Sequence, residues 1–313
     1  MQLIPFISQL AIDEQQMWCE ALNSRLTQAQ VVLPRNMSQQ QMSTSSCAIV
    51  ANPSVSDLAP FTSLVWVQSL WAGVDSLVNQ LENPVFKVVR LVDPMLANIM
   101  AEAVLTWCLY LHRQIPLYQE QQRQTIWRQH EVKQIEQHNV DIIGLGELGQ
   151  TSARLLRKVG FNVVGWSRTP KQIEGIPCYL GDDGLNQVLQ LSDTVVVLLP
   201  LTKATQQMFD QVVFSQMKKG SAIINFARGG ILNTPDLLKA LDEAHLSHAV
   251  LDVFEQEPLP AESVIWHHPK ITVTPHVSAP TNLSSASDIV ARNIQQYVNT
   301  GEVPQAVNLN KGY

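Results

Sequence analysis

The chain has 313 residues, of which 45% are hydrophobic, and this is enough for two domains that each bury a core. Lysine and arginine total 21 while aspartate and glutamate total 27, so the net charge is -6 and the isoelectric point about 5.7. Such a mildly acidic chain is not expected to bind nucleic acid, and no continuous apolar run approaches the roughly 20 residues that span a bilayer.

The N-terminal segment lacks the basic start of a signal peptide, and the four cysteines are scattered without a CxxC pair. We therefore expect a cytoplasmic protein with free thiols, no membrane partner and no metal site. His245 and His248 have a spacing that occurs in metal sites. With no third ligand beside them, a solvated helix face is the expected setting.

Short apolar runs alternate with helical stretches in the first third of the chain. The expected strands are Leu3–Ile7, Val31–Leu33, Ala48–Ala51, Leu64–Val67 and Phe86–Leu91. Helical spacing occurs over Asp13–Leu26 and Asp75–Leu81, with an aspartate near each start. This alternation predicts a small parallel sheet with right-handed crossovers.

The next segment differs, because Met95–Leu111 has almost no polar face. A helix that is apolar all round must be covered on every side, which places it at a domain junction or a subunit interface. The Gln-rich stretch from Gln114 to about His138 still contains Ile126 and Trp127 among other apolar residues. We expect it to be an arm that packs on another surface rather than a solvated linker.

From Asn139 onward the strands are nearly continuous runs of Val, Ile and Leu. The expected strands are Val140–Ile143, Asn162–Trp166, Thr194–Leu199, Ala222–Phe226, Ala249–Val253 and Ile271–Thr274. The expected helices are Gly149–Val159, Gln206–Gln216, Pro235–Ala244 and Ser285–Thr300. Such strands are typical of a parallel sheet that is buried on both faces.

A GxGxxG pattern, GLGELG, closes the first of these strands and opens a helix. In this setting Gly144 permits a tight turn, Gly146 lets the backbone approach a pyrophosphate, and Gly149 lets helix and strand pack closely. A glycine-rich turn without a ligand is the alternative. We predict a dinucleotide site.

The end of the next strand reads Ser167-Arg168-Thr169, at the position where NAD enzymes carry a carboxylate for the ribose 2′-OH. Two hydroxyls and a guanidinium suit a 2′-phosphate instead. This favours NADP(H) over NAD(H), whereas the alternative is that Arg168 is an ordinary solvated arginine.

Three chemistry-bearing residues also follow predicted strands: Arg228 in FARGG, Glu257 in LDVFEQEPLP, and His276 in TPHVSA. Because the carboxyl ends of parallel strands share one edge, we expect them to converge there. These residue types can polarise a carbonyl, tune an acid and transfer a proton. Each one taken singly could be structural.

In this order after GLGELG, FARGG, LDVFEQEPLP and TPHVSA resemble the D-isomer-specific 2-hydroxyacid dehydrogenase family. The WSRT and SLWAGVDSL segments, the terminal Gly312-Tyr313 and the length most resemble its glyoxylate/hydroxypyruvate reductase A branch. The resemblance covers essentially the whole chain, most strongly from Gly144 to His276.

The resemblance implies an α/β fold with two doubly wound parallel sheets, in which a Rossmann domain is inserted into a smaller flavodoxin-like substrate domain. The expected substrate domain is 1–104 with 284–313, and the expected dinucleotide-binding domain is 105–283. A homodimer is also implied, with a dimerisation helix and arm at about 95–138.

The family's residue roles map onto this chain as follows. Arg228 matches the arginine that grips the substrate, His276 the general acid, and Glu257 its carboxylate partner. Trp71 stands before Ala72 and Gly73, whose backbone N–H groups match those that receive the substrate carboxylate. Trp71 is bulkier than the glycine or serine often found there. Further cofactor contacts are expected at Leu145, Leu148, Leu199, Pro200 and Asp252, the last near the nicotinamide carboxamide.

These features predict an NADP-dependent reductase that converts small 2-ketoacids, glyoxylate or hydroxypyruvate, to 2-hydroxyacids. Two alternatives stay open. One is another D-2-hydroxyacid dehydrogenase, such as a phosphoglycerate dehydrogenase. The other is a non-catalytic corepressor that senses dinucleotides on the same fold.

Overall fold

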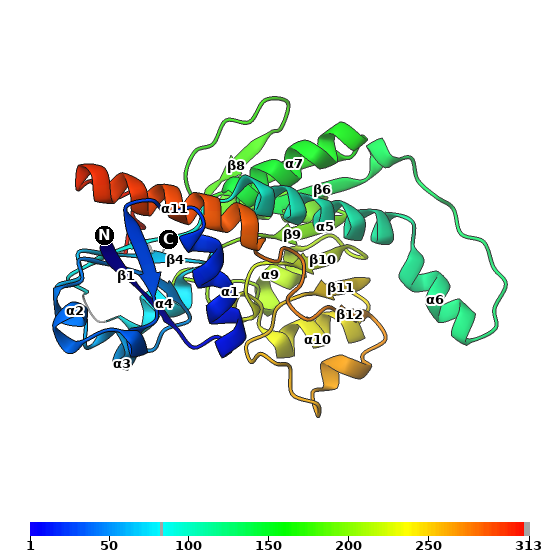
Figure 1. Ribbon diagram of the computed structural model, residues 1–313. Coiled ribbons are helices and arrows are strands. Elements are labelled where there is room, and N and C mark those ends of the chain that lie inside the picture. Colours follow the sequence, from blue (N-terminus) through cyan, green and yellow to red (C-terminus); the bar gives the residue numbers. More distant parts are fainter. Residues whose placement is uncertain (82–83, 310–313) are drawn as a thin grey trace. The chain divides into compact units, whose positions relative to one another are not determined.

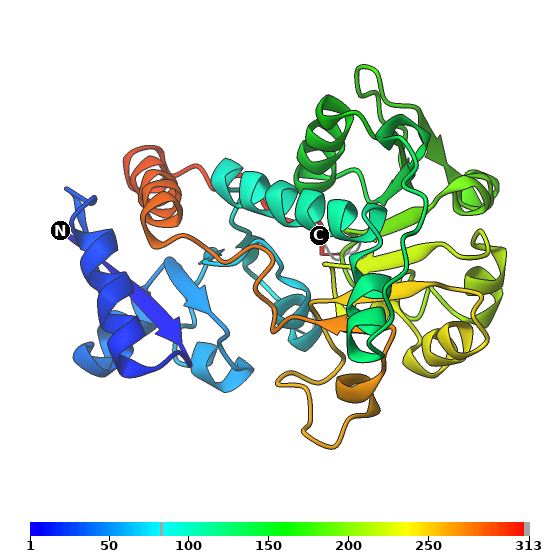
Figure 2. The same ribbon diagram turned by 90° about the vertical axis from the view of Figure 1, so that its right-hand side faces the viewer.

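The computed structural model describes residues 1–81 and 84–309, and it divides into two compact units (Figures 1 and 2). The first unit consists of residues 1–95 and the C-terminal segment from Thr281, and the second unit is Leu96–Pro280. The boundary expected after residue 104 falls inside one continuous helix, α5 (Pro94–His112). Gly312 and Tyr313, which support the family resemblance, lie outside the described residues.

The first unit is built on a five-stranded parallel sheet in the order β2-β1-β3-β4-β5. Its strands are β1 (Gln2–Ser8), β2 (Ala29–Val32), β3 (Cys47–Ala51), β4 (Trp66–Ser69) and β5 (Lys87–Val89). Its helices are α1 (Ile12–Asn23), α2 (Gln39–Thr44), α3 (Val55–Leu58), α4 (Asp75–Gln80) and α11 (Leu283–Thr300). This strand order is that of flavodoxin-like sheets, as expected.

Helices cover both faces of this sheet. On one face, Leu22 of α1 and Val290 and Ile294 of α11 share a core with Trp66 of the sheet. On the other face, Leu58 of α3 and Leu77 of α4 pack with alternate strand residues. Helix α11 therefore completes the first unit although it lies at the far end of the chain.

The second unit is built on a seven-stranded parallel sheet in the order β12-β11-β10-β9-β6-β7-β8. Its strands are β6 (Asn139–Ile143), β7 (Asn162–Ser167), β8 (Cys178–Leu180), β9 (Thr194–Val197), β10 (Ala222–Asn225), β11 (His248–Leu251) and β12 (Ile271–Val273). Its helices after α5 are α6 (Ile115–Arg123), α7 (Glu147–Val159), α8 (Gly181–Leu191), α9 (Gln211–Gln216) and α10 (Thr234–Asp242). The order reverses between β6 and β9, as in Rossmann folds, and confirms the expected architecture.

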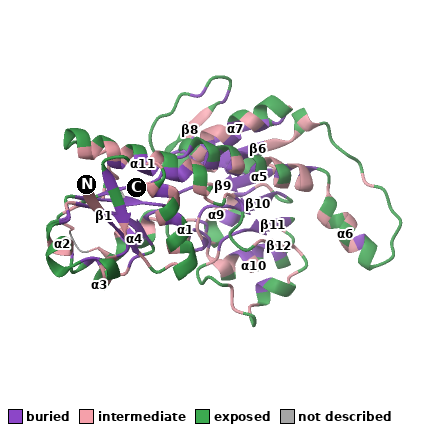
Figure 3. Ribbon diagram, viewed as in Figure 1, coloured by how far each residue is buried: buried purple, intermediate pink, exposed green. Residues whose placement is uncertain are grey.

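The second sheet is buried on both faces, as its apolar strands predict (Figure 3). α5 and α7 contribute Val104 and Leu156 to the core on one face, while α8, α9 and α10 cover the other. One buried residue of this sheet carries a carboxyl group. Asp141 of β6 is fully buried between Val164 and Val195 of the neighbouring strands, and neither carboxylate oxygen has a hydrogen-bond partner among the described residues.

Helix α5 and the arm that follows it are only partly covered within the chain. Met100, Val104 and Cys108 of α5 pack against the second sheet, whereas Trp107 is only partly buried. By length and composition α5 is the one helix in the described ranges that is apolar enough to cross a membrane, a property that core helices share. Beyond it, α6 and the extended segment after it project from the second unit (Figure 1).

The arm forms a hairpin that two of its glutamines hold together. Gln121 is buried and donates to the carbonyl oxygens of Ile126 and Arg128, and Gln114 donates to that of Glu131. Glutamine amides thus satisfy the returning backbone where no sheet does. The Trp127 side chain is 97% exposed.

Most expected elements are present, with two kinds of difference. The helix expected from Gln206 begins only at Gln211, because Thr205 instead closes a turn through its hydroxyl bond to the Pro200 carbonyl oxygen. β8, α2, α3, α6 and α8 were not predicted. β8, α2 and α3 are too short to show a periodic pattern and α6 is polar, whereas α8 carries Leu185, Val188 and Leu189 at helical spacing and was overlooked.

Candidate functional site

The glycine-rich turn lies at the point of the second unit where the strand order reverses. β6 ends at Ile143 and α7 begins at Glu147, so residues 144–146 make the turn at the carboxyl ends of the strands. Doubly wound sheets bind their ligands in the crevice outside this point.

At two of the three glycines the surrounding atoms leave no room for a Cβ, and at the third there is room. Gly144 has φ +114°, and a Cβ there would lie 2.7 Å from the carbonyl oxygen of Leu198. A Cβ on Gly149 would lie 1.9 Å from the Gly144 oxygen. On Gly146 it would meet no protein atom within 4 Å, so open space adjoins the start of α7. The first N–H groups of a helix lack intrahelical partners and attract anions.

The two leucines of the GLGELG segment pack against the core of the second unit. Leu145 is buried against Gly165, and Leu148 packs against the same core. Leu145 can therefore offer a cofactor only its backbone N–H group, whereas Leu148 is partly accessible. Across the reversal point, β9 leads into Leu199, which is buried, and Pro200, whose carbonyl oxygen accepts the Thr205 hydroxyl at 2.6 Å.

At the end of β7 the three expected residues differ in exposure. Ser167 is buried and donates its hydroxyl hydrogen to the Thr169 carbonyl oxygen at 2.6 Å, whereas Arg168 and Thr169 are exposed. The donors that face solvent here therefore belong to Arg168 and Thr169. No carboxylate stands in this run of three residues, so nothing in it would repel a 2′-phosphate.

The loop after β10 holds Arg228 through its backbone. Asn225 shapes the turn, because its side-chain oxygen accepts from the Ala227 N–H and its amide donates to the Arg228 carbonyl oxygen. The Arg228 guanidinium is half-buried and donates to the Ala227 carbonyl oxygen at 2.7 Å.

The loops that carry Arg228 and Glu257 lie against each other. A Cβ on Gly229 would lie 2.0 Å from the carbonyl carbon of Phe254, so only glycine permits this approach. The Phe254 N–H donates to Glu257 Oε1 at 2.9 Å, and Glu257 Oε2 lies 2.7 Å from His276 Nδ1. His276 keeps 53% of its side chain exposed, so it can still reach a ligand. The structure therefore brings these three predicted residues to one edge of the sheet.

Asp252 is buried and holds the loop that carries His276. Its Oδ1 accepts from the Thr274 hydroxyl at 2.6 Å and the Val277 N–H at 2.9 Å, and its Oδ2 accepts from the Ser278 N–H at 2.9 Å. Its carbonyl oxygen accepts the His276 N–H at 2.9 Å. His276 has φ +54°, a left-handed conformation that costs a non-glycine residue about 1–3 kcal/mol. These four bonds hold that conformation.

In the first unit, Trp71 and the two residues after it follow β4. The Trp71 N–H donates to Ser69 Oγ, and its indole Nε1–H donates to Asn52 Oδ1 at 2.9 Å. Ala72 and Gly73 are accessible, and no described residue accepts a hydrogen bond from their backbone N–H groups. This loop therefore presents backbone donors to solvent, as a carboxylate site requires.

The histidine pair does not lie on a solvated helix face. His248 is buried in β11, where its Nε2 lies 2.8 Å from Thr272 Oγ1, and burial lowers its pKa to about 4. His245 Nε2 lies 2.9 Å from the Met217 carbonyl oxygen. The interpretation was wrong because a strand begins at the second histidine. In the described ranges no cluster of three metal-ligating side chains occurs.

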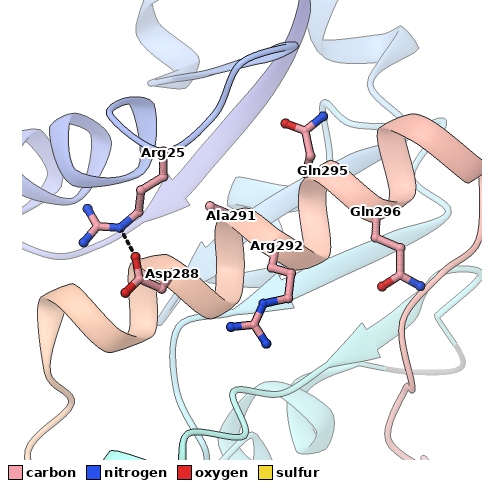
Figure 4. Close-up of a pocket in the computed structure, with 6 residues that line it drawn as sticks. All are labelled: Arg25, Asp288, Ala291, Arg292, Gln295 and Gln296. Carbon is pink, nitrogen blue, oxygen red and sulfur yellow. Dashed lines mark hydrogen bonds and ion pairs between the residues drawn. The ribbon is translucent and has the colours of Figure 1, made fainter.

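A hollow in the second unit is lined by the neighbours of Arg228 and Glu257, and a hollow on the first unit is lined by none of the predicted residues. A hollow of about 490 Å³ on the first unit lies along α11 (Figure 4). It is lined by Arg25, Asp288, Ala291, Arg292, Gln295 and Gln296, and Arg25 pairs with Asp288. The other, of about 180 Å³, lies in the second unit between the loops of Gly229 and Phe254.

Sequence reasoning missed Asn52, which directly follows β3. The expectation that functional residues follow the carboxyl ends of strands identified Arg228 and His276, and it would also have identified Asn52 in the first unit. It also missed the loop-holding role of Asp252, because hydrogen bonds to residues 274–278 leave no trace in local spacing.

The residues of the second unit fit a dinucleotide. A side chain on any other residue at position 146 would enter the open space beside the turn. The first turn of α7 offers N–H groups to a pyrophosphate in that space. Arg168 and Thr169 suit a 2′-phosphate.

Comparison with known proteins agrees with this geometry. Residues 105–278 match the family model described as D-isomer specific 2-hydroxyacid dehydrogenase, NAD binding domain. The chain is 36% identical over 306 residues to a glyoxylate/hydroxypyruvate reductase A of Yersinia enterocolitica, covering 96% of this chain and 97% of the relative.

Two solved structures are similar throughout. One is a D-isomer specific 2-hydroxyacid dehydrogenase of Xanthobacter autotrophicus in complex with NADPH and MES, with a TM-score of 0.91, 34% identity and 99% of each chain covered. The other is an NADPH-dependent glyoxylate/hydroxypyruvate reductase of Sinorhizobium meliloti in complex with NADP and sulfate, with a TM-score of 0.90, 30% identity and 100% of each chain covered.

Proposed function

Because the chain belongs to the D-isomer-specific 2-hydroxyacid dehydrogenase family, we propose that it is an NADPH-dependent reductase of small 2-ketoacids. Its reactions are the reduction of glyoxylate to glycolate and of hydroxypyruvate to D-glycerate. The observation that carries this proposal is the Glu257–His276 pair, with Nδ1 and Oε2 at 2.7 Å, beside the loop of Arg228.

Each residue of the site has its own part in the reaction. The Arg228 guanidinium holds the substrate carboxylate and stabilises negative charge as it develops on the keto oxygen. His276 gives its proton to that oxygen, and Glu257, which binds the opposite ring nitrogen, orients the imidazole. The backbone N–H groups of Ala72 and Gly73 receive the substrate carboxylate. When bound, the nicotinamide supplies the hydride that reduces the keto carbon.

The cofactor assignment rests on the end of β7. Gly144, Gly146 and Gly149 shape the pyrophosphate site, and Arg168 with Thr169 offers donors to a 2′-phosphate that no neighbouring carboxylate in that run repels. The Xanthobacter and Sinorhizobium proteins, whose folds match, are solved with NADPH or NADP. We assign Leu199, Pro200 and the Asp252 region to the nicotinamide end.

We also propose a cytoplasmic homodimer formed through α5 and the arm. Trp107 on α5 is only partly covered within one chain, and Trp127 on the arm is 97% exposed. The arm hairpin is held by its own glutamine bonds, so it is preformed for a partner. Sedimentation of the wild type and of Trp127→Ser tests this, since a monomeric wild type would contradict it.

The activity is tested by initial rates of four 2-ketoacids with each nicotinamide cofactor. We expect NADPH to be consumed with glyoxylate and hydroxypyruvate, and pyruvate and 3-phosphohydroxypyruvate to be poorer substrates. Preference for the phosphorylated substrate would make the chain a phosphoglycerate-type dehydrogenase. Tight NADPH binding without turnover of any substrate would favour the corepressor alternative.

A further inference from the structure

Trp71 is fixed at four points within the first unit. Its N–H donates to Ser69 Oγ at 3.0 Å and its carbonyl oxygen accepts the Leu91 N–H at 3.0 Å. Its indole ring meets that of Trp18 edge to face, with centroids 6.3 Å apart. Its Nε1–H donates to Asn52 Oδ1 at 2.9 Å. The indole is therefore held from the backbone side, from one ring edge and at its only polar atom.

The two residues directly after Trp71 are not held by hydrogen bonds from their N–H groups. The N–H groups of Ala72 and Gly73 have no acceptor among the described residues, and both residues are accessible. Two adjacent backbone donors can bind one carboxylate only while they point the same way. Since residue 73 is a glycine, whose backbone is flexible, the direction of these two N–H groups depends on how firmly Trp71 is held.

Asn52 is well suited to hold the indole. It directly follows β3, the neighbour of β4 in the sheet, and has φ +51°. Asparagine enters this left-handed region more readily than other non-glycine residues, and it also carries a neutral acceptor oxygen. An aspartate would satisfy the same geometry but would place a negative charge near a bound carboxylate.

We propose that Asn52 is a positioning residue for substrate binding: by holding the Trp71 indole, it fixes the loop whose Ala72 and Gly73 N–H groups receive the carboxylate of the 2-ketoacid. This rests on the proposed function. Asn52 acts through Trp71, so its loss changes substrate affinity rather than the chemical step. It also explains how a bulky tryptophan is accommodated in a loop that binds a small acid.

The test is a double-mutant cycle of Asn52→Gly and Trp71→Phe. Glycine accepts the positive φ and removes only the amide, and phenylalanine keeps a ring against Trp18 but has no N–H donor. Each single change removes the same neutral hydrogen bond, which corresponds to about 3–10-fold in affinity. The KM for glyoxylate and the inhibition constant of oxalate, an unreactive dicarboxylate, should both rise by this factor.

Three further readouts separate positioning from a general loss of structure. The kcat should stay within about twofold, because Asn52 acts through Trp71 on substrate binding rather than on the chemical step. The KM for NADPH should not change, because neither residue lies in the second unit. The double variant should be no worse than the poorer single variant, since both remove one interaction. Asn23→Ala is the matched control. Asn23 bonds both backbone groups of Val31, so this change should lower Tm without altering KM.

Unchanged oxalate affinity in both single variants, or effects that multiply in the double variant, would overturn the proposal. An equal rise in KM for Asn23→Ala would also overturn it, because stability alone would then explain the effect. If the wild type consumes no NADPH, the proposed function fails. Oxalate binding measured by calorimetry with NADPH bound then still tests Asn52, and absence of such binding in the wild type would refute this role.

Discussion

Asp252→Asn is the most informative change in the second unit, because it alters a residue that we expect to act through the His276 loop. The Asp252 carboxylate accepts three hydrogen bonds, from the Thr274 hydroxyl and the N–H groups of Val277 and Ser278. An asparagine keeps one acceptor oxygen. Its NH₂ group would then face the Ser278 N–H, so two donors would meet where one bond existed.

The expected effect follows from these bonds. One charge-assisted hydrogen bond is worth about 1.5–3 kcal/mol, so the free energy of unfolding should fall by about that amount. His276 is held at φ +54°, and the loop gains about 1–3 kcal/mol if this residue relaxes. The free energy of the lost hydrogen bond and the gain from relaxing His276 are similar, so we expect the loop to shift. Since a misplacement of about 1 Å can cost a factor of about 10², we predict a 10–100-fold lower kcat.

Steady-state kinetics with NADPH and glyoxylate, combined with urea denaturation, measure both effects. Asp193→Asn is the matched control. Asp193 also accepts a backbone N–H, from Asn139, and pairs with Lys218, but it precedes β9 and so lies at the opposite edge of the sheet from His276. It should cost stability without lowering kcat. A folded Asp252→Asn enzyme with wild-type kcat would refute the positioning of His276 by Asp252.

Three other changes test separate parts of the account. Burial raises the pKa of the Asp141 carboxyl well above 3.8, so as the pH rises the carboxyl loses its proton in the unfolded chain before it does so in the folded protein. The free energy of unfolding therefore falls as the pH rises above 3.8. Asp141→Val should remove this decline and raise the free energy of unfolding at pH 7 by about 1–3 kcal/mol. Urea denaturation of both proteins at pH 5 and pH 8 measures this, and no gain in the variant would mean that the carboxyl is solvated. Glu257→Ala removes the carboxylate that orients the His276 imidazole, and since a misplacement of about 1 Å can cost a factor of about 10², the kcat for glyoxylate should fall by about 10–100-fold; a wild-type kcat would argue against the pair. Ser167→Asp with Arg168→Ala should collapse a preference for NADPH over NADH that we expect to be at least about 10-fold, and a double variant that still prefers NADPH would make Arg168 a solvated loop residue.

The sheets and the strand-end residues were predictable because they depend on local sequence. Alternating apolar strands and helices specify a doubly wound fold, and in such a fold every strand end lies at one edge. Arg228, Glu257 and His276 could therefore be placed together without coordinates. Gly144 and Gly149 were likewise predictable, since close packing leaves no room for a Cβ at either position.

Long-range side-chain bonds were not predictable. Asp252 holds residues more than 20 positions away, and Asn52 holds an indole 19 positions away, while neither spacing has a local pattern. His248 was misplaced because a strand begins at it and its polar partner comes from β12. Asp141 lies in an otherwise apolar strand, and only the sheet register shows valines on both sides.

The most direct test of the central claim is the rate of NADPH oxidation with glyoxylate by the wild type and by His276→Ala and Arg228→Ala. Proton transfer and a charged donor to the developing oxyanion each contribute about 10²-fold or more, so each variant should lose at least that factor in kcat/KM. NADPH affinity, measured by fluorescence titration, should stay unchanged. Near wild-type turnover in either variant, or a wild type that consumes no NADPH, would contradict the assignment of this site.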